Sequence, residues 1–203
     1  MPNDPSMREK IEASQMELDE VMELAGLKKI EVPEDLSKPF ITILPDINNQ
    51  KRQIITMMVL GEYLQIDSKM SVLVTNFFFR HCQGTTWEAV QAIVETHEFE
   101  VFQTKIVNEM PFLRKLSILK EIYDIPKDIV SKVNKLNDFR NAIAHSLVPE
   151  NLEHNRTLYN EQSIFTNDGI KVFLTDVQSV MDFLQNHFIE AFEINSKRSE
   201  AQE

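Results

Sequence analysis

The sequence predicts an all-α protein, and three observations support this class. Gly is scarce at four residues and Met is plentiful at nine, a composition that favours helices. Apolar residues recur every three or four positions along most of the chain, whereas the strict alternation of half-buried strands is nearly absent. With 203 residues, of which 42% are hydrophobic, the chain is long enough to bury one core. We therefore expect one helical domain.

A polar helix is expected first, followed by a connector. Residues 5–25 carry an intermittent apolar stripe and end before Gly26, a residue suited to a C-terminal cap. This helix would pack either on the body of the protein or on a partner. In the connector, residues 40–44 suggest an extended strip, because three prolines should interrupt any helix there: Pro33, Pro39 and Pro45. The expected segments are an acidic N-terminal helix and linker (1–49), a helical domain (50–195) and a polar tail (196–203).

The first half of the helical domain is expected to contain four helices. Two apolar faces, over residues 54–64 and 70–78, predict a helical hairpin in which Asp67 or Ser68 starts the second helix. Thr85 and Glu88 match a capping box that opens the third helix. The fourth helix should run from about Glu98 to Met110 and stop at Pro111.

The second half continues with a helix over 112–123 and an amphipathic helix from Lys127 to about Leu147. The apolar positions of the amphipathic helix step by three or four, and they are Ile129, Val133, Leu136, Phe139, Ile143 and Leu147. Residues 163–165 and 170–174 then predict a small β-hairpin around an Asp168-Gly169 turn. Thr175 and Gln178 should cap the last helix.

Charge and composition restrict the function. The formal net charge of −11 disfavours loose binding to nucleic acid, which depends on Lys and Arg. About half of this excess lies in residues 1–35, with ten acidic and four basic side chains, whereas residues 112–140 hold seven basic and four acidic ones, a net +3. The single Cys82 excludes an internal disulfide, no apolar run is long enough for a membrane span, and no targeting segment is recognisable. We therefore expect a cytoplasmic protein.

One polar group of residues stands out in the amphipathic helix. It lies within the ten-residue stretch Leu136-Asn137-Asp138-Phe139-Arg140-Asn141-Ala142-Ile143-Ala144-His145. Asn141 and His145 are four residues apart and therefore share a helix face. Arg140 and His145 diverge by about 140° on a regular helix, but the long guanidinium side chain can extend back toward the imidazole.

These three side chains suit metal-free cleavage of RNA. Histidine can take the proton from the 2′-hydroxyl near neutral pH, because its ordinary pKa is about 6.5. A guanidinium offers a planar fork of donors to the phosphorane that follows. We assign the general base to His145, charge stabilisation to Arg140, and an orienting or phosphate-binding role to Asn141. As an alternative, an Arg and a His on an exposed helix face are often only solvated or capping groups.

The Arg140-Asn141-x-x-x-His145 string resembles the Arg-polar-x-x-x-His signature of the HEPN superfamily. This resemblance implies an up-and-down helical bundle, a homodimer whose motif helices face one cleft, and often a metal-independent endoribonuclease of a toxin–antitoxin or phage-defence system. It also implies an RNA substrate and an antitoxin or regulatory protein as partner. A more distant similarity to mannitol operon repressor-like regulators supports the alternative, a catalytically inactive regulatory or protein-interaction module that would use its acidic N-terminal helix to bind a partner.

No cofactor or metal site is expected. His81-Cys82 is a possible ligand pair, but no second Cys-x-x-Cys or His-x-x-x-His motif completes a tetrahedral set. No Gly-rich phosphate-binding loop is present in the sequence. The aromatic run Phe77-Phe78-Phe79 is more typical of a core than of a base-stacking surface.

Overall fold

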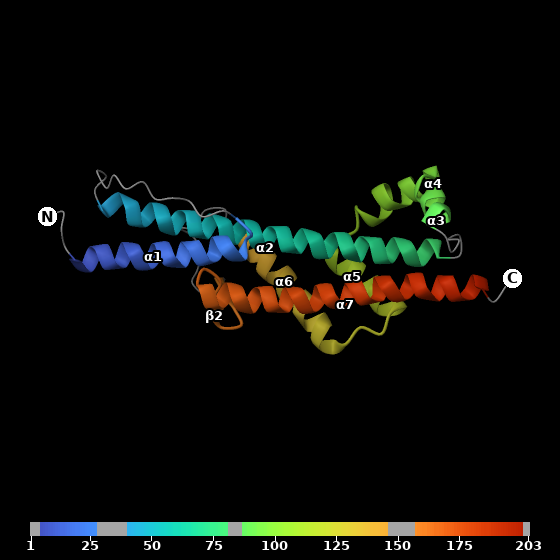
Figure 1. Ribbon diagram of the computed structural model, residues 1–203. Helices are drawn as coiled ribbons and strands as arrows, with labels where there is room; N and C mark the ends of the chain where they lie inside the picture. The colour runs from blue at the N-terminus through green and yellow to red at the C-terminus, as the bar shows by residue number, and fades with distance from the viewer. Residues whose placement is uncertain (1–4, 28–39, 81–86, 146–156, 201–203) are drawn as a thin grey trace. The chain divides into compact units, whose positions relative to one another are not determined.

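The computed structural model describes residues 5–27, 40–80, 87–145 and 157–200, which are mostly helical (Figure 1). The elements in chain order are α1 (Pro5–Leu24), α2 (Phe40–Phe79), α3 (Trp87–Val94), α4 (His97–Val101), the π-helical η1 (Phe102–Val107), α5 (Phe112–Ile122), α6 (Lys127–His145), β1 (Leu158–Tyr159), β2 (Gln162–Ser163) and α7 (Asn167–Glu200). The two strands pair in an antiparallel hairpin. The predicted helical class and the small hairpin before the last helix are therefore confirmed.

The chain forms two compact units. Unit 1 comprises Met1–Gly61 and Phe139–Leu174, and unit 2 comprises Glu62–Asp138 and Thr175–Glu203. Helices α2, α6 and α7 each contribute one part to each unit. No helix within the described residues has the length and the apolar character needed to cross a membrane.

In unit 1, α1 packs on the body of the unit. Its apolar residues Leu18, Val21 and Met22 are buried. Glu17 forms an ion pair with Lys51 of α2, with 2.5 Å between Glu17 Oε2 and Lys51 Nζ. The helix ends as the sequence predicts, because Gly26 adopts a positive φ of 67°. In this Schellman motif the Leu27 amide donates to the Met22 carbonyl and the Gly26 amide donates to the Glu23 carbonyl.

A carboxylate of α1 also binds the start of α7. Glu20 accepts hydrogen bonds from the side chains of Lys171 and Asn167. The hydrogen bond from Lys171 is the main cause that lowers the pKa of Glu20, and the same bond raises the pKa of Lys171. Part of the negative charge of residues 1–35 is therefore neutralised within unit 1.

The hairpin of unit 1 lies earlier than the sequence predicts. Its turn is Asn160-Glu161, where both residues have positive φ angles of 49° and 67°, the combination found in type I′ turns. The expected Asp168-Gly169 turn is wrong, because both residues lie in the first turn of α7. Thr166 begins this helix, since its hydroxyl accepts a hydrogen bond from the Gly169 amide at 3.1 Å. The predicted cap at Thr175 is therefore also wrong.

In unit 2, α2 does not break where the sequence predicts a helical hairpin. It is one helix of 40 residues, in which the expected extended strip 40–44 is also helical. Asp67 does not begin a new helix, because its carboxylate accepts two 2.8 Å hydrogen bonds from the buried ammonium of Lys115 on α5. The side chain of this polar position is therefore used for a contact with a distant residue and not for a helix cap.

The remaining helices of unit 2 follow the sequence with one exception. Helix α5 spans Phe112–Ile122, close to its predicted range. The helix predicted over 98–110 is instead the short α4 followed by the π-helical η1. Phe79 packs edge-on against Phe99 and Phe102, so part of the phenylalanine run joins these elements to α2. The predicted capping box at Thr85 lies outside the described residues.

Candidate functional site

Helix α6 carries the motif that the sequence singles out. It begins after Pro126, with Asp128 in its first turn, where a carboxylate favours the positive end of the helix dipole. Its apolar face is buried as predicted, at Ile129, Val133, Leu136, Phe139 and Ile143. The helix extends to His145, so all three motif residues are helical and belong to unit 1.

The core of unit 1 holds the motif-bearing turn of α6 in place. The ring of Phe139 packs edge-on against Tyr159 of the hairpin, with ring centroids 5.4 Å apart, and lies 6.0 Å from the ring of Phe173 on α7. Tyr159 and Phe173 also pack against each other at 5.4 Å. This aromatic triangle anchors the residue immediately before Arg140.

Arg140 and Asn141 form a direct side-chain contact. Arg140 Nη1 donates a hydrogen bond to Asn141 Oδ1 at 3.0 Å, and both residues are half-buried. On a regular helix Asn141 lies about 100° from Arg140, in the same rotational direction as position 145, which lies about 140° away. The hydrogen bond therefore turns the guanidinium toward the face that carries position 145.

His145 is placed through its backbone only. It is the last residue of α6, one turn after Asn141, and its side chain lies outside the described part of the structure. The structure thus brings two of the three predicted site residues into contact, and the assignment of His145 remains a prediction.

Asn137, which opens the polar part of the motif stretch, has a structural role in unit 2. It is buried, and its Oδ1 accepts a hydrogen bond from the Tyr63 hydroxyl at 3.3 Å. The Tyr63 ring stacks on Phe112 with centroids 4.4 Å apart. This polar pair within the core could not be found from the sequence, because its members are 74 positions apart.

Acidic partners neutralise part of the basic stretch 112–140. Lys115 binds Asp67 of α2, and Lys132 lies 3.6 Å from Asp176 of α7. When these two carboxylates are included, the net charge of the stretch falls from +3 to +1. The stretch therefore offers fewer phosphate contacts than its composition suggests.

Some residues assigned to apolar helix faces are exposed instead, Leu64 and Phe78 among them. Leu64 and Phe78 are 62% and 53% exposed, whereas their neighbours Ile66 and Val74 are fully buried.

Within the described residues, no three His, Cys, Asp or Glu side chains are placed to hold a metal ion together.

No family model, curated protein or solved structure matches this chain.

Proposed function

We propose that the protein is a metal-independent endoribonuclease of HEPN type, with Arg140, Asn141 and His145 as its site. The hydrogen bond from Arg140 to Asn141 carries this proposal, since it directs the guanidinium toward the helix face of position 145. A cation and an imidazole on one face can address a single phosphodiester.

In the proposed reaction, His145 takes the proton of the RNA 2′-hydroxyl. The 2′-oxygen then attacks the adjacent phosphorus, and the bond from phosphorus to the 5′-oxygen breaks. The leaving 5′-oxygen takes up a proton, so the products are a 2′,3′-cyclic phosphate end and a 5′-hydroxyl end. Arg140 stabilises the negative charge of the phosphorane through its fork of N–H donors. DNA lacks the nucleophile and should remain intact.

Asn141 would act through its amide nitrogen. Its Oδ1 accepts the hydrogen bond from Arg140, so its Nδ2 is the group that can donate to a phosphate oxygen or to the imidazole. In this role Asn141 both positions the guanidinium and contributes a donor to the site.

The test is cleavage of a labelled RNA in excess EDTA, with the ends of the products identified by their phosphate chemistry. The wild-type protein should form 2′,3′-cyclic phosphate ends. His145→Ala should lower the rate about 10²–10⁴-fold, the usual contribution of a general base, and Arg140→Ala should lower it about 10²–10³-fold.

Two exposed residues provide matched controls. His97→Ala and Arg114→Ala remove the same chemical groups from exposed positions of unit 2, and both variants should cleave at the wild-type rate. All four variants should keep the wild-type unfolding midpoint. Intact RNA with the wild-type protein, or equal loss of activity in the controls, would contradict the proposal.

A second candidate is a catalytically inactive regulatory or protein-interaction module of the same fold. The neutralisation of Lys115 and Lys132 favours it, because fewer cations remain to hold RNA. One observation counts against it. Glu17 and Glu20 are bound to lysines within unit 1, so fewer acidic side chains of α1 remain for a partner. An inactive module predicts that RNA survives the assay above, with no difference between wild type and His145→Ala.

A further inference from the structure

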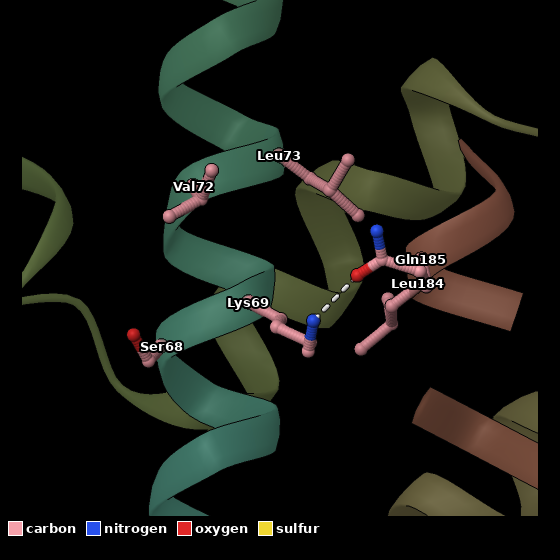
Figure 2. Close-up of a pocket in the computed structure, with 6 residues that line it drawn as sticks. All are labelled: Ser68, Lys69, Val72, Leu73, Leu184 and Gln185. Atoms are coloured by element: carbon pink, nitrogen blue, oxygen red, sulfur yellow. Dashed lines mark hydrogen bonds between the residues drawn. The ribbon is translucent and has the colours of Figure 1, made fainter. Parts of the chain in front are cut away.

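A hollow of about 230 Å³ lies in unit 2, where α2 and α7 both contribute to its walls (Figure 2). Much of the wall is apolar, because Leu73 and Leu184 line the hollow with side chains that are otherwise buried. Figure 2 shows Lys69 of α2 projecting toward Gln185 of α7. The full lining is Ser68, Lys69, Val72, Leu73, Leu184 and Gln185. The hollow therefore combines an apolar wall with a single cation.

The ammonium group of Lys69 has a neutral partner. Lys69 is half-buried, and its Nζ donates a 2.7 Å hydrogen bond to Gln185 Oε1. The chain has 32 acidic residues, yet no carboxylate in the described part of unit 2 forms an ion pair with this lysine. Asp67, two positions away, is already paired with Lys115. Since partly desolvated charges in proteins are usually paired, an anion from outside the chain would complete this site.

Two donor groups meet where Lys69 contacts Gln185. Gln185 uses its Oε1 to accept from Lys69, so its Nε2 is left to donate, and the ammonium keeps further N–H donors. A carboxylate has two acceptor oxygens and can take one charge-assisted hydrogen bond from the ammonium and one from the amide. One cation neutralises a monoanion, whereas a phosphate dianion would keep excess negative charge. The donors and the apolar wall together favour a carboxylate that carries a hydrocarbon chain.

We propose that this hollow binds a small amphiphilic carboxylate. Its carboxylate group lies at Lys69 and Gln185. Its hydrocarbon chain packs against Val72, Leu73 and Leu184. The volume sets the size of the ligand, because at about 30 Å³ for each water-sized group the hollow holds about eight non-hydrogen atoms. A six-carbon monocarboxylate has this size.

Titration with hexanoate, followed through the backbone amide signals in ¹H–¹⁵N NMR spectra, tests this site. The signals of residues 68–73 and 184–185 should shift to saturation. Butanoate lacks two methylenes and should bind about 10-fold more weakly, since each buried methylene contributes about fourfold. Hexanamide has the same chain without the charge and should bind at least about 10-fold more weakly. No saturable shift with hexanoate, or equal affinities for the three compounds, would overturn the proposal.

A matched pair of variants tests the role of the cation. Lys69→Gln should weaken hexanoate binding at least about 10-fold. Lys105→Gln removes the same charge from an exposed lysine of unit 2 that does not line the hollow, and should bind hexanoate as the wild type does. Equal affinities of the two variants would contradict the site. Should Lys69→Gln fail to fold, the comparison of hexanoate with hexanamide on the wild-type protein still decides whether the charge is required. None of these outcomes bears on the ribonuclease assay, because no motif residue lines the hollow.

Discussion

Gly169 and Gly61 are both helical glycines, and the structure predicts opposite effects for the same substitution. A Cβ at Gly169 would lie 2.0 Å from the Ser163 carbonyl oxygen and 2.7 Å from its carbon. A Cβ at Gly61 would have no atom within 4 Å. Gly169 is therefore required by the close approach of the hairpin to α7, whereas Gly61 only adds flexibility to α2.

The expected magnitudes follow from these contacts. Overpacking usually costs about 1–3 kcal/mol, and Gly169→Ala should lie near the top of that range because the atoms it would strike belong to the backbone. The gain from replacing a helical glycine is about 0.5–1 kcal/mol. We therefore expect Gly169→Ala to lower the free energy of unfolding by about 2 kcal/mol, and Gly61→Ala to raise it by about 0.5–1 kcal/mol.

Urea unfolding followed by far-UV circular dichroism measures both changes, and near-UV dichroism reports on the aromatic packing of Tyr159. Gly169→Ala should weaken the near-UV signal as the hairpin moves away from α7, whereas Gly61→Ala should leave it unchanged. A Gly169→Ala protein as stable as the wild type would refute the packing of the hairpin on the first turn of α7.

Three further changes test other contacts. Asp67→Asn should lower the free energy of unfolding by about 3 kcal/mol, since it leaves the Lys115 ammonium buried without its counter-charge; a change below 1 kcal/mol in urea unfolding would contradict the pair. Burial raises the pKa of Glu62, so the folded state holds this proton to a higher pH than the unfolded chain and stability falls as pH rises through that window. Glu62→Gln should thus raise the melting temperature at pH 7 and leave it unchanged below about pH 4, and equal effects at both values would exclude this cause. Asn141→Ala should remove the hydrogen bond that orients the Arg140 guanidinium and slow RNA cleavage about 10²-fold in single-turnover assays, with no loss if the hydrogen bond is incidental.

Local periodicity was sufficient to predict the helices whose buried faces are regular. Helix α6 was predicted from the spacing of its buried apolar residues, which are Ile129, Val133, Leu136, Phe139 and Ile143. The end of α1 was predicted from Gly26. In these segments the burial pattern, the cap and the helix propensity agree, so a short window of sequence contains the information needed.

Tertiary contacts decided the elements that the sequence misplaced. Asp67 and Ser68 have the composition of a helix start, but both lie within the continuous helix α2, and the Asp67 carboxylate binds Lys115, 48 positions away, instead of capping a helix. Asp168-Gly169 is a common hairpin turn, yet Gly169 serves close packing against Ser163, and the turn forms at Asn160-Glu161 instead. In each case, a polar or small residue that makes a contact with a residue distant in the sequence resembles the local signal of a helix start or a turn.

The residues of the candidate site could be predicted from the sequence, but their side-chain contacts could not. The residue types and the spacing of Arg140, Asn141 and His145 are properties of the sequence. The hydrogen bond that turns the guanidinium, and the pairing of Lys115 and Lys132 with Asp67 and Asp176, depend on side-chain placement. The Arg140–Asn141 hydrogen bond favours the proposed ribonuclease, whereas the two ion pairs would weaken the binding of an RNA substrate. The sequence alone could not weigh these two effects against each other.

The most direct test of the proposed site is the rate at which 2′,3′-cyclic phosphate ends form on RNA in excess EDTA. We expect measurable cleavage by the wild-type protein and a loss of about 10²-fold or more in His145→Ala and Arg140→Ala, with unchanged unfolding midpoints and unchanged rates in His97→Ala and Arg114→Ala. RNA that stays intact with the wild-type protein, or a His145→Ala variant that cleaves at the wild-type rate, would contradict the assignment.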